Sequence, residues 1–134
     1  MSVRLAPSIL SADFAALGDA VRTVERGGAD QIHLDVMDGH FVPNLSVGTQ
    51  VVEALRPLAT AHGAILDVHL MIERPERQVA EFAKAGADMI TVHWEATPHV
   101  HYALKAVREL GCLAGLALTP ATYIGKAAEL AKRL

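Results

Sequence analysis

The feature that most constrains this chain is a regular alternation of two kinds of segment. Five short apolar runs of the strand type are each followed by a stretch whose apolar side chains recur at helical spacing. Asp13 is placed to cap the first helix, Gly27 and Gly28 to end it, and Pro57 to shorten or kink the second. This order is typical of a parallel sheet with right-handed helical crossovers. We expect strands over residues 5–10, 31–37, 65–72, 89–94 and 113–118, and helices over about 14–26, 47–58, 75–84, 98–110 and 125–134.

A short internal repeat indicates the length of one strand–helix unit. The sequence Gly-Ala-Asp at residues 28–30 returns 58 residues later at residues 86–88, each time just before a predicted strand. The offset corresponds to two units of about 29 residues, close to the ~31 residues of one unit in an eight-stranded barrel of ~250 residues. The alternation alone also allows an open doubly wound sheet, but the unit length favours the barrel. We expect the repeat to be structural, because its glycine ends a helix and its aspartate lies in the following turn.

Composition places the chain among single-domain globular proteins. With 134 residues, 51% of them hydrophobic, it can bury one substantial core, so we expect one α/β domain over residues 1–134, a partial TIM (β/α)8 barrel of about five βα units. The net charge of −3 and the lack of a basic cluster argue against nucleic acid as a partner. A lone cysteine, Cys112, and the lack of a long apolar run argue against an internal disulfide and a membrane span, which indicates a cytoplasmic protein.

Unusual polar residues lie near the carboxyl ends of two predicted strands, where the reactive groups of βα proteins are found. His33 and Asp35 are two residues apart on one strand, so their side chains leave the same face, and His69 lies late on the next strand. Two imidazoles and a carboxylate suit a divalent cation such as Zn, Mn, Fe or Co. The alternative is a hydrogen-bonded core histidine and an aspartate that caps a turn. Because burying an unpaired charge is costly, the cluster gives a site about the same weight as this alternative, and both interpretations stay open.

Several long motifs resemble those of the ribulose-phosphate 3-epimerase family. The resemblance covers about residues 5–122, most of the chain, and contiguous motifs of this length indicate common ancestry. The motifs are Ala6-Pro7-Ser8-Ile9-Leu10-Ser11-Ala12-Asp13, His33-Leu34-Asp35-Val36-Met37-Asp38-Gly39-His40-Phe41-Val42-Pro43-Asn44, Asp67-Val68-His69-Leu70-Met71 and Thr91-Val92-His93-Trp94-Glu95-Ala96-Thr97.

The resemblance implies a metal-assisted proton exchange at C3 that interconverts D-ribulose 5-phosphate and D-xylulose 5-phosphate. His33, Asp35 and His69 would be three of four ligands of a metal that stabilises the enediolate. Asp35 would also be one of two acid/base groups, which must act on opposite faces of the planar intermediate for inversion to follow. A related phosphoketose 3-epimerase is the neighbouring possibility.

The resemblance also implies which residues contact the pentulose phosphate. Ser8 and His69 would touch the substrate, and Met37 and Met71 would form an apolar wall over the metal. Without the resemblance, both methionines would be ordinary core residues.

Other polar residues of the motifs have simpler interpretations. His40 is expected to be either a plain loop residue or a substrate contact. His93 is expected to be either a packing residue or a substrate contact. Asp38 is expected to close a turn with Gly39 rather than to act as the second base. Surface positions are expected for His62, His99 and His101.

The last part of the chain departs from the family pattern, over residues 123–134. The resemblance implies three further βα units, with the second catalytic aspartate, which is also the fourth ligand, and with the Gly-rich phosphate loops. Five units cannot close an eight-stranded barrel, so the outer strands would present unpaired edges. We expect a fragment, an engineered partial barrel or a natural truncation, completed by self-association, a complementary fragment or rearrangement into an open sheet.

Two functions of different classes therefore remain open from the sequence. One is the epimerase activity that the ancestry implies. The other is a catalytically incomplete half-barrel that serves as an assembly module and binds metal through His33, Asp35 and His69. A flavodoxin-like binding protein is disfavoured, because no phosphate-binding loop follows the first predicted strand.

Overall fold

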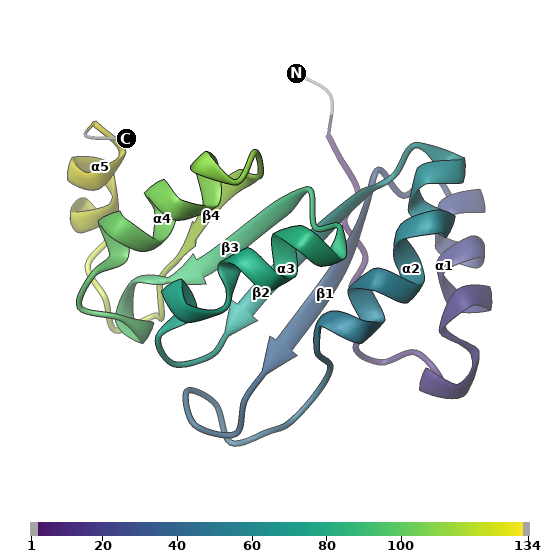
Figure 1. Cartoon of the computed structure of the whole chain (residues 1–134), viewed down its shortest axis with the longest axis horizontal. Coiled ribbons are helices and arrows are strands. Elements are labelled where there is room, and N and C mark those ends of the chain that lie inside the picture. The colour runs from purple at the N-terminus through teal and green to yellow at the C-terminus, as the bar shows by residue number, and fades with distance from the viewer. Residues whose placement is uncertain (1–2, 133–134) are drawn as a thin grey trace.

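The fold is a parallel four-stranded sheet whose strands follow one another in chain order (Figure 1). The computed structural model describes residues 3–132. The strands are β1 (Gln31–Met37), β2 (Ile65–Met71), β3 (Met89–His93) and β4 (Leu113–Ala117), and each pairs in parallel with the next. The expected parallel α/β arrangement with helical crossovers is confirmed.

One layer of helices covers one face of this sheet (Figure 1). Since each crossover is right-handed and leads to the adjacent strand, successive helices lie on the same side. No helix among residues 3–132 is long and apolar enough to cross a membrane. The helices are α1 (Leu17–Arg26), α2 (Thr49–His62), α3 (Val79–Ala85), α4 (Val100–Glu109) and α5 (Gly125–Ala131), with short 3-10 turns at Phe14–Ala16, Pro75–Arg77 and Trp94–Ala96.

The core lies between the sheet and the helices. In β1, buried and half-buried residues alternate, as the side-chain period of a strand requires. The alternation puts Ile32, Leu34 and Val36 against the helices and leaves the intervening side chains on the opposite, open face. The main core residues of the other strands are Leu66, Val68, Leu70, Ile90 and Val92. The open face carries the polar residues that the sequence singled out.

The helix boundaries follow local signals with one exception. Asp13 caps the turn before α1, since its carboxylate accepts a hydrogen bond from the Ala15 N–H at 2.9 Å, and Gly27 ends the helix. Pro57 does not shorten α2, which continues to His62. The carbonyl that loses its partner belongs to Glu53, and both residues are exposed, so water can satisfy it.

The prediction of a regular strand over residues 5–10 is wrong. The segment runs extended beside β1 but forms only an isolated bridge, between Ser8 and His33. Its backbone bonds include the His33 N–H to the Pro7 carbonyl at 3.0 Å and the Ile9 N–H to the His33 carbonyl at 3.1 Å. Pro7 has no N–H, so the ladder bond that this residue would donate to β1 cannot form. The segment still covers the outer edge of β1.

The Gly-Ala-Asp repeat is structural, as expected. Asp30 accepts the Leu5 N–H at 2.7 Å, and Asp88 accepts the Leu66 N–H at 2.8 Å, so each aspartate holds the start of the neighbouring extended segment. Gly86 has a φ of 112°, and a Cβ built there would lie 2.6 Å from the side chain of Arg56. Glycine is therefore required at this turn for both backbone conformation and space.

Candidate metal and proton-transfer site

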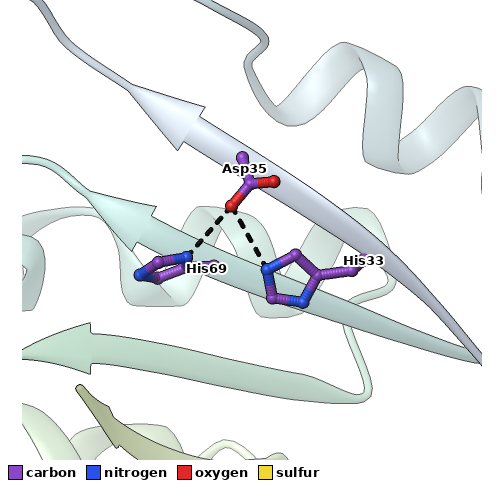
Figure 2. A group of neighbouring side chains, drawn as sticks. All are labelled: His33, Asp35 and His69. Carbon is purple, nitrogen blue, oxygen red and sulfur yellow. Dashed lines mark hydrogen bonds and ion pairs between the residues drawn. The ribbon is translucent and has the colours of Figure 1, made fainter. Parts of the chain in front are cut away.

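The register of β1 and β2 brings the polar residues of the open face together. Parallel pairing places His33 opposite Asp67 and Asp35 opposite His69. Residues two apart on a strand share a face, so all four side chains leave the sheet on the same side. Figure 2 shows His33, Asp35 and His69 converging from the two strands. Asp35 and His69 lie past the middle of β1 and β2, toward the carboxyl ends, whereas His33 and Asp67 lie just before the middle.

One carboxylate oxygen is the centre of this cluster. Asp35 Oδ1 lies 3.2 Å from His33 Nε2 and 3.0 Å from His69 Nδ1 (Figure 2). The three residues are half-buried, and each offers one ligand atom within 4.8 Å of the others. Two imidazole nitrogens and a carboxylate oxygen are a donor set that fits a divalent transition metal.

Asp67 orients the first of these imidazoles. Its Oδ2 lies 2.7 Å from His33 Nδ1, and its side chain is 9% exposed. This hydrogen bond raises the pKa of His33, against the burial that lowers it, and the negative charges of Asp67 and Asp35 add to the rise. Because a carboxylate can only accept, His33 Nδ1 carries a proton toward Asp67, so in the neutral ring that a cation would require the lone pair is on Nε2, the atom that faces Asp35.

Asp67 has no role among the residues that the sequence predicts for the site. The available signal was an aspartate two residues before His69, on the inward-facing positions of the same strand. Its partner follows from the β1–β2 register, which local sequence does not fix.

Ser8 reaches the other oxygen of Asp35. The Ser8 hydroxyl donates to Asp35 Oδ2 at 2.6 Å, and its oxygen accepts the Leu10 N–H at 3.2 Å. Burial favours a higher pKa for Asp35, but the Ser8 hydrogen bond and the neighbouring His33 and His69 outweigh it, so the pKa is lowered. Asp35 is therefore anionic at neutral pH, as both a metal ligand and a base must be.

The two methionines stand side by side above the cluster. Met37 pairs with Met71 in the β1–β2 register, two residues beyond Asp35 and His69 and therefore on the same open face, and both are half-buried. The Asn44 amide contacts the Met37 sulfur at 3.5 Å. Their positions suit an apolar wall beside the site, and their contact with substrate stays a prediction.

His93 on β3 extends the cluster to a third strand. Its Nε2 lies 2.8 Å from His69 Nε2, and the two rings are stacked with centroids 4.9 Å apart. The sequence left this residue between packing and substrate contact. The structure shows a hydrogen bond between His93 and His69, a proposed metal ligand, and neither interpretation included this contact.

The loop after β1 has the expected turn. The Asp38 carboxylate accepts the backbone N–H groups of His40 and Phe41, both at 2.9 Å, and that of Glu73 at 2.8 Å. Burial acts to raise the pKa of Asp38, but these three hydrogen bonds outweigh it and the pKa is lowered. The role of Asp38 as a turn residue is confirmed. His40 is exposed, and so are His62, His99 and His101.

Comparison with known proteins identifies the family. The model of the ribulose-phosphate 3 epimerase family matches residues 4–134. The chain belongs to this family. It is 57% identical over 122 residues to the ribulose-phosphate 3-epimerase of Bacillus subtilis, covering 91% of this chain and 55% of that protein. It is 54% identical over 123 residues to the enzyme of the same name from Synechocystis, covering 90% of this chain and 52% of that protein. The chain thus spans about half the length of the curated relatives it matches.

Solved structures support the fold class. The crystal structure of KGPDC from Streptococcus mutans matches with a TM-score of 0.73 at 21% identity, over 98% of this chain and 61% of that one. A phospho-2-dehydro-3-deoxyheptonate aldolase from Thermotoga maritima matches with a TM-score of 0.68 at 13% identity, over 96% of this chain and 35% of that one. At these identities the likeness concerns the fold alone, which is that of a partial TIM barrel. The departure of residues 123–134 from the family pattern stays a prediction.

Proposed function

We propose that the chain takes part in the interconversion of D-ribulose 5-phosphate and D-xylulose 5-phosphate. Its share of the site would be three metal ligands, His33 Nε2, Asp35 Oδ1 and His69 Nδ1, and one of the two acid/base groups. The observation that carries the proposal is the position of Asp35, whose Oδ1 lies within 3.2 Å of both imidazole nitrogens while Oδ2 is held by Ser8.

The two oxygens of Asp35 suit two different tasks. Oδ1 faces the imidazoles, where a ligand atom is needed. Oδ2 faces the Ser8 hydroxyl, whose hydrogen bond keeps the carboxylate in one orientation and lowers its pKa against the effect of burial. Oδ2 would take the proton from C3 of the substrate and return a proton to the same carbon. This transfer requires C3 to lie within hydrogen-bond reach of Oδ2.

A divalent cation would supply charge stabilisation to the substrate oxygens next to the carbon that loses its proton. The donor set of two nitrogens and one oxygen is suited to Zn, Mn, Fe or Co rather than to Ca or Mg, which prefer oxygen ligands. Asp67 already orients His33 as outer carboxylates do for metal-bound histidines. The residues therefore fit a cation of this class.

Inversion at C3 needs a second acid/base on the opposite face of the substrate. Three other carboxylates toward the same end of the sheet are engaged elsewhere. Asp67 holds His33, Asp38 holds three backbone N–H groups, and Glu95 accepts from Thr119. The proposal therefore gives this chain one acid/base, Asp35, and with it one face of the reaction.

This one-sided arrangement leads to a direct test by proton NMR in D2O. The C3–H signal of each pentulose 5-phosphate is followed with the chain and Zn²⁺, Mn²⁺, Fe²⁺ or Co²⁺ added in turn. Paramagnetic cations are removed before the spectra are recorded. A base on one face removes the C3 proton of only one of the two epimers. We expect cation-dependent exchange of one epimer with solvent, and no exchange with Asp35→Asn.

The possible outcomes distinguish removal of the C3 proton from inversion at C3. Exchange without inversion would support a site with one base, and exchange with inversion would show that a second acid/base is also supplied. Equal signals from the unsubstituted chain and Asp35→Asn would refute the proposal. Circular dichroism of both proteins shows that the comparison is between folded chains.

Ser8, His69, Met37 and Met71 are proposed to contact the pentulose phosphate, since they surround Asp35 or stand beside it on the open face. A related phosphoketose with the same C2–C3 grouping would meet the same residues. We propose the cytoplasm as the compartment, in keeping with a lone, buried Cys112.

A second function, that of an assembly module, is favoured by the edge of the sheet. In the described part of the chain β4 pairs only with β3, and Leu113 at its start is 58% exposed. We propose that a second copy or a complementary barrel fragment covers this edge. Sedimentation equilibrium measures the first possibility, and a strictly monomeric chain at micromolar concentration would exclude it.

A further inference from the structure

A chain of polar contacts continues from His69 away from the proposed cation. His69 Nε2 lies 2.8 Å from His93 Nε2, and His93 Nδ1 faces Glu95 Oε2 at 3.6 Å. The other oxygen of Glu95 accepts the Thr119 N–H at 2.8 Å and the Thr119 hydroxyl at 2.9 Å. These contacts link the carboxyl ends of β2, β3 and β4.

The positions of the ring protons would be set by cation binding, since in the metal-free contact His69 Nδ1 faces the Asp35 carboxylate, which can only accept. His69 can bind a cation through Nδ1 only if that nitrogen carries a lone pair, so the neutral ring must keep its proton on Nε2. That proton is then donated to His93 Nε2, which must be a bare acceptor. His93 in turn carries its own proton on Nδ1, the atom that faces the Glu95 carboxylate.

We infer that His93 and Glu95 are positioning residues that hold His69 in the tautomer whose Nδ1 binds the cation. The inference rests on the metal site of the proposed function and names two residues that act on it indirectly. In the opposite tautomer His69 would donate from Nδ1 to Asp35 and could not bind a cation there.

The surroundings of His93 fix the direction of its ring. It is 9% exposed and lies between the stacked ring of His69 and the tilted ring of Phe41, both with centroids at 4.9 Å. Its Nδ1 is buried and has no hydrogen-bond partner within ordinary distance. A buried N–H is costly to leave unpaired, which favours closure of the 3.6 Å gap to Glu95.

The charge on Glu95 supports the direction of the chain. Burial acts to raise its pKa, but hydrogen bonds from Thr122 and from the backbone and hydroxyl of Thr119 outweigh this and lower the pKa to about 2. Glu95 is therefore an anion at neutral pH and can only accept from His93.

The test measures the binding of Co²⁺, whose visible absorption reports coordination, with affinities obtained by competition against a chelator. The proteins are the unsubstituted chain, His93→Leu, His93→Gln, Glu95→Gln and the exposed control His62→Leu. Removing an outer partner of a metal ligand weakens binding by ~10–100-fold, which we expect for His93→Leu. Glutamine can accept the His69 proton through its amide oxygen, so His93→Gln should lose less than ~10-fold. Glu95→Gln should fall between the two, and His62→Leu should bind as the unsubstituted chain does.

A proton readout separates this role from packing. In the Co²⁺-loaded chain the Nε2–H of His69 should give a shifted, solvent-exchangeable NMR signal. We expect the signal to persist in His93→Gln and to be lost by fast exchange with solvent in His93→Leu. Far-UV circular dichroism and thermal unfolding report whether each variant is folded, and Glu95→Gln carries the test if His93→Leu is not.

Each result bears on the inference. Equal affinity of His93→Leu and the unsubstituted chain would overturn it, as would equal losses in His93→Leu and His93→Gln, which indicate packing alone. Unchanged affinity in Glu95→Gln would show that Glu95 does not position His69, and it would overturn the inference if His93→Leu does not fold. If the unsubstituted chain did not bind Co²⁺, the metal site of the proposed function would fall together with this inference. In each of the other cases the unsubstituted chain binds Co²⁺, and the metal site of the proposed function is not contradicted.

Discussion

Replacing Asp67 by leucine tests how the site controls the proton of His33. Leucine has the same branching as aspartate, is larger, and accepts no hydrogen bond. In the unsubstituted chain Asp67 Oδ2 lies 2.7 Å from His33 Nδ1 and keeps the ring proton there. In Asp67→Leu the proton is favoured on Nε2, where Asp35 Oδ1 at 3.2 Å can accept it. The nitrogen that faces the proposed cation would then be blocked.

The magnitude follows from the role of Asp67 behind a metal ligand. Loss of such a partner weakens metal binding by ~10–100-fold, or about 1.4–2.8 kcal/mol at ~1.4 kcal/mol for each factor of ten. The side chains of Asp67 and His33 are 9% and 24% exposed, so solvent screens their contact only in part. We therefore expect a loss in the upper half of this range.

Isothermal titration with Zn²⁺ at neutral pH measures the effect directly. The control is Asp19→Leu, the same replacement at a side chain that is 77% exposed on α1. Asp19→Leu should bind Zn²⁺ as the unsubstituted chain does. If Asp67→Leu also bound with unchanged affinity, the tautomer of His33 would not depend on Asp67 and the reasoning would be refuted.

Three further predictions concern the metal-free chain. The pKa of His33 is raised chiefly by the hydrogen bond to Asp67, so this pair stabilises the fold below about pH 6.5. The free energy of unfolding, measured with urea, should therefore decrease as pH rises through the raised pKa. This decrease should be smaller in Asp67→Leu. The pKa of Glu95 is lowered from 4.5 to about 2, so stability should be lost as pH falls through this interval, and Glu95→Gln should show a smaller slope in the same assay. Gly86→Ala places a Cβ at a φ of 112° and 2.6 Å from a neighbouring side chain, whereas Gly63→Ala, at a φ of 72°, meets nothing within 4 Å. Thermal unfolding should show that Gly86→Ala costs more, by about 1–3 kcal/mol against ~1 kcal/mol, and equal costs would contradict the steric argument.

The strands were predictable because their pattern is locally encoded. Apolar runs bounded by turn residues gave β1 at residues 31–37 as observed and the other three strands to within one residue at each end. The failure at residues 5–10 has a local cause that the sequence also contained, since Pro7 lacks the N–H that a ladder requires. The turn role of Asp38 was similarly readable from the adjacent Gly39.

The candidate site was predictable only in part, because its contacts depend on strand register. His33 and Asp35 share a face by the period of a strand, whereas the pairing of His33 with Asp67 depends on how β2 aligns beside β1. The contact between His69 and His93 depends in the same way on β3. The Asp67 carboxylate and the His93 imidazole were visible in the sequence as polar groups within predicted strands, but their partners were not.

The most direct test of the account is a crystal structure of the chain soaked in Zn²⁺, with the ion located by its anomalous scattering. We expect one ion on the open face of the sheet, with His33 Nε2, Asp35 Oδ1 and His69 Nδ1 all about 2.0–2.2 Å from it. We also expect His69 Nε2 to keep its contact with His93. An ion bound elsewhere, or bound through His69 Nε2 with the His93 contact broken, would contradict this expectation.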